Sequence, residues 1–314
     1  MSRKIISLFV LLFVMNLAGC GKSGKGSRVA LSERQIEVVT TTGMIGDMAV
    51  NVGGERVNVT ALMGPGIDPH LYKASEGDVT ALVKADIVFF NGLHLEGKMA
   101  EVLEKMSGRT KTVAVGEKIP VESLLSPPEF KGAHDPHIWF DVSLWLVALQ
   151  AMRDGFMELD PEHEEIYRSN AAKYEAELVQ LDNYIKEKTS ELQEEMRVVI
   201  TAHDAFNYFG KAYGFEVRGL QGISTASEAG TGDVQELASF IVERRIPAIF
   251  VESSIPVRTI EAVQAAVKAK NIEVKIGGEL YSDALGNPET AEGNYIGMFR
   301  HNIDTIVNAL SIKN

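Results

Sequence analysis

Residues Pro161 to Glu195, PEHEEIYRSNAAKYEAELVQLDNYIKEKTSELQEE, separate the chain into two halves of similar character. The stretch is highly charged and contains no glycine. An apolar stripe of roughly helical period is typical of a helix that lays one face on a core. The residues of that stripe are Ile166, Tyr174, Leu178, Leu181 and Ile185. We therefore predict one long helix between the two halves.

Both halves alternate short apolar runs with helical patterns. In the first half, strands are predicted at 36–42, 57–62, 87–90 and 112–115, with helices at 44–52, 75–83 and 99–106. In the second half, strands are predicted at 198–201, 217–220, 248–252 and 272–276, with helices at 205–213, 234–244 and 257–269. Repeated strand-then-helix order is typical of a parallel sheet flanked by helices. The fold class is therefore α/β, with two lobes joined by one long backbone helix, and we expect limited lobe motion because such a helix is stiff.

The amino-terminal residues have the pattern of a lipoprotein signal peptide. Arg3 and Lys4 precede an apolar run of about ten residues, which is too short to cross a membrane as a helix. Leu17-Ala18-Gly19-Cys20 resembles the lipobox, in which the cysteine becomes lipidated. The predicted organisation is a signal peptide at 1–19, lipidated Cys20 with a flexible tether at 20–34, an N-terminal metal-binding lobe at 35–160, the linking helix at 161–195 and a C-terminal metal-binding lobe at 196–314. We expect the protein to work outside the cytoplasm, anchored to the cell membrane by a lipid on Cys20.

Composition excludes several classes of function. The formal net charge is -12, whereas a nucleic-acid-binding protein needs a concentrated surplus of Lys and Arg. With one cysteine in the chain, neither an internal disulfide nor a cysteine-based zinc site can form. A metal site in this protein would have to use histidines and carboxylates.

Two histidines of the first half lie in loops that proline restrains. His70 ends the segment Met63-Gly64-Pro65-Gly66-Ile67-Asp68-Pro69-His70, which follows a predicted strand. His137 lies in His134-Asp135-Pro136-His137-Ile138-Trp139, before a helix that starts near Asp141. Open α/β sheets bind ligands at the carboxyl ends of their strands, so both histidines are candidate ligands.

The second half offers two more candidates in the same kind of position. His203 follows a predicted strand and opens the predicted helix, a place that tends to keep an imidazole neutral and able to bind a metal. Asp283 comes just past the last predicted strand. Two ligands from each lobe would meet in the cleft between them.

The other histidines are weaker candidates. A single loop histidine is more often a surface or hydrogen-bonded residue than a ligand. His94 lies in a glycine-flanked loop without a partner motif, and His134 fits better as a neighbour of the site than as a ligand. His163 falls at a helix start and His301 in the last helix, so neither is assigned to the site.

The chain resembles a known family, the cluster A-I metal-binding lipoproteins, which are solute-binding proteins of manganese and zinc ABC importers. The resemblance covers essentially the whole mature chain and rests on ordered motifs. They are Gly66-Ile67-Asp68-Pro69-His70-Leu71-Tyr72, His134 to Trp139, Thr201-Ala202-His203-Asp204-Ala205-Phe206, Gly219-Leu220-Gln221-Gly222-Ile223-Ser224, Phe250-Val251-Glu252-Ser253-Ser254 and Gly278-Glu279-Leu280-Tyr281-Ser282-Asp283.

The resemblance implies that His70, His137, His203 and Asp283 bind one divalent transition-metal ion, Mn²⁺ or Zn²⁺, as transported ligand. It also implies a partner, an ABC permease with its cytoplasmic ATPase, and no enzymatic activity. We expect a monomer that does not bind nucleic acid.

The sequence favours manganese, with zinc close behind. The segment 121–133 lacks the histidine-rich loop of dedicated zinc members. Many manganese members, however, have Glu in place of His203, and the extra imidazole suits zinc at least as well. A bidentate Asp283 would favour manganese, and a monodentate one the tetrahedron of zinc. Asp68, Asp135, Asp204 and Glu252 are expected to orient the imidazoles, and protonation of the three histidines near pH 5 to 6 is expected to weaken binding.

Three alternatives stay open at this stage. A zinc-specific importer subunit would use the same site. A metal-binding surface adhesin would need an exposed patch that sequence does not identify. A metal hydrolase would need an open coordination position and a general base, and the chain contains no HExxH, Gly-x-Ser-x-Gly or phosphate-binding loop.

Overall fold

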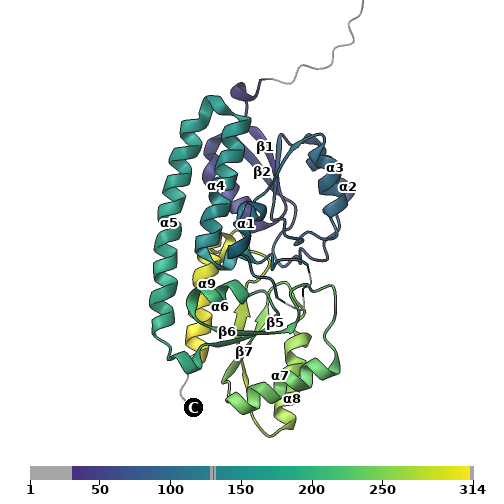
Figure 1. Ribbon diagram of the computed structural model, residues 1–314, viewed down its shortest axis with the longest axis vertical. Helices are drawn as coiled ribbons and strands as arrows, with labels where there is room; N and C mark the ends of the chain where they lie inside the picture. The colour runs from purple at the N-terminus through teal and green to yellow at the C-terminus, as the bar shows by residue number, and fades with distance from the viewer. Residues whose placement is uncertain (1–29, 128–129, 131, 312–314) are drawn as a thin grey trace, which may run out of the picture.

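The structure is a computed structural model that describes residues 30–127, 130 and 132–311. The predicted signal peptide and Cys20 lie outside the described residues. Helix α5 (Glu164–Ser190) runs along the side of both lobes (Figure 1), and 3-10 turns at Pro161–His163 and Glu194–Met196 flank it. The predicted long helix is therefore confirmed, although it ends at Ser190, before the predicted end near Glu195.

The N-terminal lobe contains a four-stranded parallel sheet in the order β2-β1-β3-β4. The register pairs Val38 of β1 with Val59 on one side and Ile87 on the other. Of the two central strands, β3 is apolar throughout and β1 is apolar except at Glu37 and Thr40, as expected for strands covered on both faces. The elements are β1 (Ile36–Thr40), α1 (Gly43–Gly53), β2 (Val57–Ala61), α2 (Glu76–Lys84), β3 (Ile87–Phe90), α3 (Ala100–Ser107), β4 (Lys111–Ala114) and α4 (Val142–Leu159).

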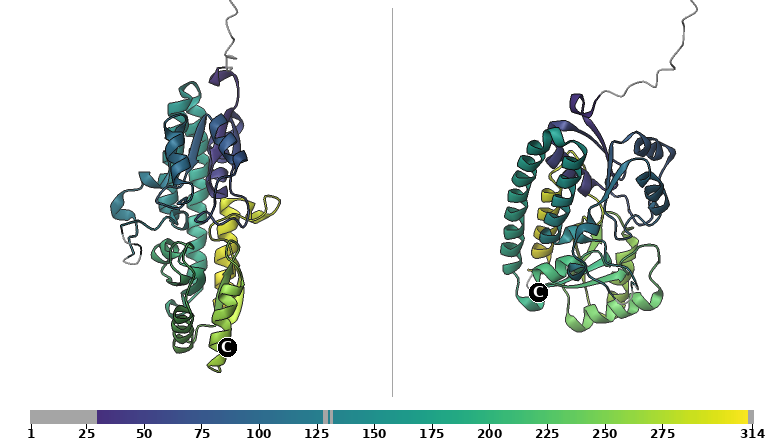
Figure 2. Two further views of the ribbon diagram at one scale, coloured as in Figure 1. Left: turned by 90° about the vertical axis from the view of Figure 1, so that its right-hand side faces the viewer. Right: turned by 45° about the horizontal axis from the view of Figure 1, so that its top comes forward.

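The C-terminal lobe contains two parallel strand pairs, β5-β6 and β7-β8, with β5 lying against β7. The last helix packs against β8 of this lobe and also against α5 and α1. Figure 2 shows this yellow helix beside the long helix α5. The elements are β5 (Val198–His203), α6 (Asn207–Tyr213), β6 (Glu216–Gln221), α7 (Thr231–Arg244), β7 (Ala248–Glu252), α8 (Arg258–Ala269), β8 (Lys275–Leu280) and α9 (Tyr295–Leu310). The α/β class with two lobes and one backbone helix is confirmed.

The last strand is shifted from its predicted position. A strand was expected at 272–276, but β8 begins at Lys275 and continues through Gly277 and Gly278 to Leu280. Gly277 and Gly278 therefore lie inside the strand, and a Cβ on Gly277 would come within 2.8 Å of a Phe250 ring carbon. Gly277 is needed for close packing, and Gly278 also for its φ of 146°, which other residues rarely adopt.

One hydrophobic core spans both lobes. It includes Trp145 on α4, Leu178 on α5, Phe209 on α6 and Phe299 on α9, all buried. A core shared by both lobes resists their separation on the side of α5, because any large movement would expose apolar surface to water.

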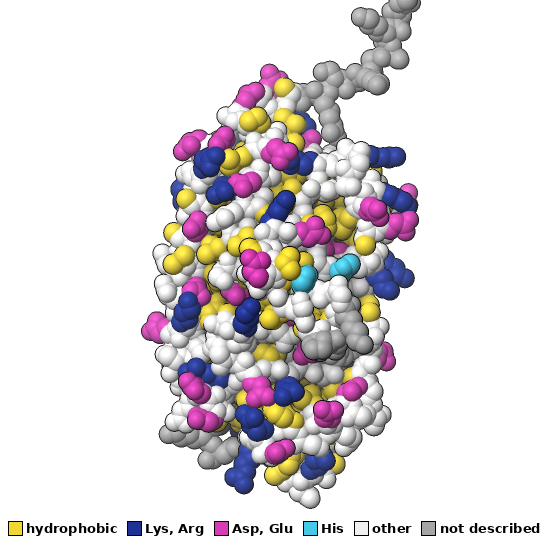
Figure 3. Space-filling view, in the orientation of Figure 1, with side chains coloured by type: hydrophobic (Ala, Val, Ile, Leu, Met, Phe, Trp, Pro, Cys, Tyr) yellow, Lys and Arg dark blue, Asp and Glu magenta, His cyan; other side chains and the backbone are white. Residues whose placement is uncertain are grey.

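The molecular surface mixes both signs of charge. On the face shown in Figure 3, Lys and Arg side chains are interspersed with Asp and Glu. Within residues 30–127, 130 and 132–311, no helix has the length and apolar character needed to cross a membrane.

Candidate metal centre

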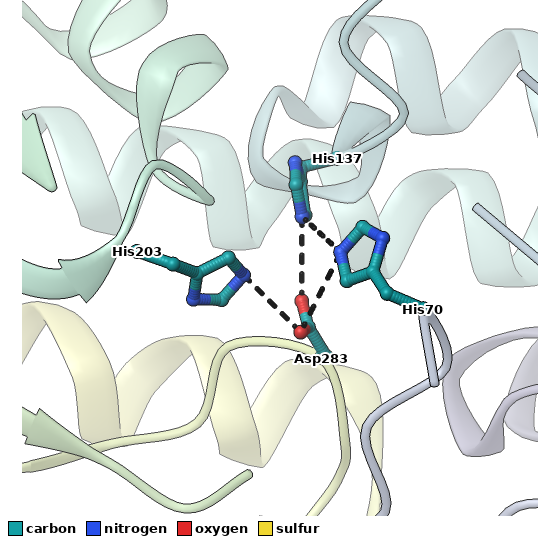
Figure 4. Close-up of side chains that lie close together, drawn as sticks. All are labelled: His70, His137, His203 and Asp283. Carbon is teal, nitrogen blue, oxygen red and sulfur yellow. Dashed lines mark hydrogen bonds and ion pairs between the residues drawn. The ribbon is translucent and has the colours of Figure 1, made fainter. Parts of the chain in front are cut away.

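His70, His137, His203 and Asp283 converge on one point between the lobes (Figure 4). One ligand atom from each residue lies within 4.8 Å of those of the other three. The Nε2 atoms of His70 and His137 are 3.3 Å apart, and Nε2 of His203 is 3.2 Å from Oδ2 of Asp283. Ligand atoms around a tetrahedral ion with bonds of about 2.1 Å are about 3.4 Å apart, so the arrangement has the size of a coordination shell.

His70 comes from the long loop between β2 and α2. Gly66, with φ of 71°, gives this loop a left-handed turn that other residues adopt reluctantly. Asp68 Oδ1 accepts a hydrogen bond from the backbone N–H of His70 (2.8 Å), so Asp68 fixes the backbone of the ligand. This differs from the expected role, in which Asp68 would orient the ring.

His137 is delivered by the segment between β4 and α4, where Asp141 caps the helix. The Asp135 carboxylate holds His137 twice, since Oδ1 lies 2.7 Å from the ring Nδ1 and 3.0 Å from the backbone nitrogen. This contact leaves Nε2 as the ring nitrogen that faces the other ligands. Asp135 therefore has the ring-orienting position that the sequence predicted for it.

His203 is the last residue of β5, and the sequence prediction of its surroundings was wrong. Helix α6 begins only at Asn207, so His203 does not open a helix. Glu252, at the end of β7, accepts from the backbone N–H of His203 (2.9 Å) and places Oε2 2.7 Å from Nδ1. The charge of a neighbouring carboxylate, and not a helix terminus, therefore sets the state of this ring.

Asp283 follows β8 directly and is buried. Its Oδ1 lies 3.5 Å from Nε2 of His137, and its Oδ2 lies 3.9 Å from Nε2 of His70. Within the described part of the chain, the two oxygens of Asp283 and Nε2 of His203 make no hydrogen bond of normal geometry, whereas Nδ1 of His203 is paired with Glu252. Buried polar atoms without partners cost free energy unless something else satisfies them, and a dication would satisfy Nε2 of His203 and both oxygens of Asp283.

Burial and charge shift the pKa values of these groups in different directions. Burial lowers the pKa of His70 to about 3. Burial also opposes a charge on His203, but the carboxylates of Glu252 and Asp283 outweigh it and raise the pKa of that ring well above its usual range. For Asp283, burial opposes ionisation, and the charge of His203 overcomes it and holds the pKa below its usual range. The metal-free site is therefore an imidazolium between two carboxylates.

The remaining histidines lie elsewhere. His94 and His134 line a surface cavity beside α3, and Nδ1 of His134 lies 2.8 Å from the hydroxyl of Ser126. His163 contacts Asp160 at the start of α5, and His301 on α9 lies 3.0 Å from the carbonyl of Glu279. None of them joins the group of four.

Sequence reasoning missed residues that join the two lobes near the site. Trp139 donates its indole N–H to the carbonyl of Ser282 (2.9 Å), next to Asp283. Thr225 donates its hydroxyl to Oδ2 of Asp68 (2.6 Å). These contacts join residues far apart in sequence. Trp139 lies in the motif that carries His137, but its cross-lobe role has no local signal, and Thr225 lies in no motif.

Fold and site together define a class of protein: two α/β lobes on one backbone helix, with a buried three-histidine, one-carboxylate cluster where the lobes meet. The chain belongs to the family described as zinc-uptake complex component A, periplasmic, whose sequence model matches residues 38–309. The family resemblance inferred from the motifs is therefore confirmed.

Named relatives match almost the entire chain. The manganese-binding lipoprotein MntA of Bacillus subtilis is 48% identical over 98% of this chain and 99% of its own length. The zinc-binding protein TroA of Treponema pallidum is 51% identical over 91% of this chain and 92% of its own length. The solved structure of the periplasmic zinc-binding protein TroA superimposes with a TM-score of 0.86, covering 88% of this chain and 99% of that one. The names of both relatives describe binding proteins and not enzymes.

Proposed function

We propose that this protein is the solute-binding lipoprotein of an ABC importer, which captures one divalent transition-metal ion and delivers it to a membrane permease. The observation that carries the proposal is the convergence of three imidazole nitrogens and the Asp283 carboxylate at a buried point between the lobes. Family membership and the names of the relatives support the transport role.

The proposed ligands are Nε2 of His70, His137 and His203 together with the carboxylate of Asp283. Both oxygens of Asp283 face the imidazoles, which provides five donor atoms and supports bidentate binding. Five-coordination suits manganese, and the identity with MntA favours the same ion. Zinc is close behind because three imidazoles bind it strongly and TroA is named for it. Calcium and magnesium are disfavoured, because both prefer a mostly oxygen shell.

The remaining parts of the proposal concern the membrane. The relatives named as lipoproteins support an extracytoplasmic location. We assign the lipid to Cys20, the signal peptide to 1–19 and the tether to 20–34, ahead of the lobes at 35–160 and 196–314 and the linking helix at 161–195. The protein is proposed to act as a monomer that docks on its permease, which a cytoplasmic ATPase powers.

The function is tested by metal content and competition. Protein purified without added metal is expected to contain about one equivalent of a first-row dication by elemental analysis. Competitive titration of manganese against zinc then measures the relative affinity of the site for the two ions. His203→Ala and Asp283→Ala are expected to lose this equivalent, whereas the control His94→Ala is expected to keep it, since His94 is exposed and outside the cluster. Binding by both site variants at the level of the parent would refute the ligand assignment.

A further inference from the structure

The two lobes make both inner and outer contacts. The inner contacts are buried: Tyr208 donates its hydroxyl to the carbonyl of Asp135 (3.0 Å), Trp139 donates to Ser282, and Tyr295 donates to the carbonyl of Trp139 (2.6 Å). These residues belong to the core that both lobes share, or border it directly. The inner contacts therefore do not open without exposing that core.

The outer contact beside the ligands is the hydrogen bond from Thr225 to Asp68, and Lys211 makes another outer contact with the carbonyl of Ser123. Thr225 lies in the loop between β6 and α7, and Asp68 lies in the loop that carries His70. Residues 64–67 and 226–228, on either side of this bond, are exposed. A rotation of the lobes about their buried inner contacts would separate Thr225 from Asp68. Opening at this part-buried bond would expose less apolar surface than opening at the inner contacts.

The Asp68 carboxylate connects this outer contact to the proposed metal shell. Its Oδ1 holds the backbone N–H of His70, while its Oδ2 accepts from the opposite lobe. His70 is also the most exposed of the four ligands, at 5% against 1% or less for the others. Detaching His70 is therefore the least obstructed route by which an ion leaves, and Asp68 and Thr225 close that route.

We infer that the Asp68–Thr225 hydrogen bond is a cross-lobe latch that sets the rate at which the captured ion dissociates. The inference rests on the proposed function. Asp68 and Thr225 act through His70 as positioning residues and do not coordinate the ion. Exposed residues 64–67 and 226–228 border the latch, so a permease that docks on these loops could open it, and a captured ion would be retained in solution and released at the membrane.

The decisive variant is Thr225→Val, which removes the hydroxyl while leaving the contact of Asp68 with His70 intact. Protein loaded with Zn²⁺ is mixed with excess chromogenic chelator, and release is followed by stopped-flow absorbance. The dissociation rate is expected to rise about tenfold, in line with the loss of a hydrogen bond to a carboxylate. Thr225→Ser, which restores the donor, is expected to release at the rate of the parent.

Two controls separate a latch from general damage. Tyr72→Phe removes another hydroxyl–carboxylate bond (Tyr72 to Asp78, 2.7 Å), two residues from His70 but within one lobe, and is expected to leave release unchanged. Asp68→Ala is expected to speed release, and adding Thr225→Val to it is expected to change nothing further, because the partner is already absent.

Three outcomes would overturn the latch. The first is release from Thr225→Val at the rate of the parent, and the second is equal acceleration in Tyr72→Phe. The third is slower association together with an altered visible spectrum of the Co²⁺-loaded variant, which would indicate a distorted shell. Failure of the latch is distinct from failure of the proposed function, because the parent protein itself would bind no metal if the proposed function were wrong.

Discussion

His203 is the residue whose chemistry controls loading of the site. It lies between the carboxylates of Glu252 and Asp283, which keep its ring protonated when no metal is present. A metal needs the lone pair on Nε2, so binding has to expel a proton. The bound ion thereby takes the place of the positive charge of the imidazolium. The two buried carboxylates are therefore compensated by a positive charge both with and without metal.

The first prediction follows from this exchange. At pH 7 metal binding is expected to release about one proton, and affinity is expected to rise with pH through the neutral range until the raised pKa of His203 is passed. Titration calorimetry in two buffers of different ionisation enthalpy measures the proton count. Glu252→Gln removes one of the two carboxylates, so the pKa of His203 falls and fewer protons are released. Heats that do not depend on the buffer would refute the exchange.

The sequence-based expectation that all three histidines titrate near pH 5 to 6 was wrong. With a pKa of about 3, His70 stays neutral throughout that range and does not compete with the metal. His203 is protonated already at neutral pH. Burial and neighbouring charge, neither of which a sequence displays, separate two histidines that look alike in the chain.

At the scale of elements, α5 is held by its apolar stripe and not by its charges. Tyr174, Leu178, Leu181 and Ile185 are all buried, as their spacing predicted, whereas Ile166 of the same stripe is 40% exposed. The exposed faces carry ion pairs such as Lys186–Asp182, which contribute little to stability in water.

The second prediction compares two neighbouring residues of this helix. Leu178→Ala is expected to lower the free energy of unfolding by about 2–5 kcal/mol, because Leu178 is fully buried and the substitution leaves a cavity. Val179→Ala is the matched control, since Val179 is 44% exposed, and its effect is expected to stay within about 0.5 kcal/mol. Urea unfolding followed by circular dichroism measures both. Equal effects would contradict the assigned orientation of the helix.

On the scale of the whole molecule, the shared core makes the lobes one thermodynamic unit. Residues of α4, α5, α6 and α9 pack in the same cluster, which therefore contains side chains from before and after the linking helix. Neither lobe can unfold without exposing apolar surface of the other, which favours a single cooperative transition.

The third prediction concerns that transition. Metal-free protein is expected to unfold in one calorimetric step, and metal at a hundredfold excess over its Kd is expected to stabilise the folded state by about 2.7 kcal/mol. Excess chelator is expected to return the transition to its metal-free temperature. Two resolved transitions, of which only one responds to metal, would mean that the lobes unfold independently.

The fold and the candidate ligands could be predicted from the sequence because their signals are local. Helical period along α5, apolar runs at β1 and β7, and histidines placed after proline are all visible over a few residues. Element boundaries that depend on packing could not be predicted from the sequence. Strand β8 extends across Gly277, against which Phe250 and Ala309 pack, and α6 starts later than expected.

Only the tertiary structure decided which groups support the ligands and how strongly each holds a proton. Thr225 meets Asp68 across 157 residues of chain, and Glu252 reaches His203 across 49. Such pairs depend on how two lobes fold against one shared core. The amino-acid sequence thus determined the lobes, the linking helix and the four side chains offered to a metal, while charge, burial and cross-lobe bonding arose from packing between segments distant in the chain.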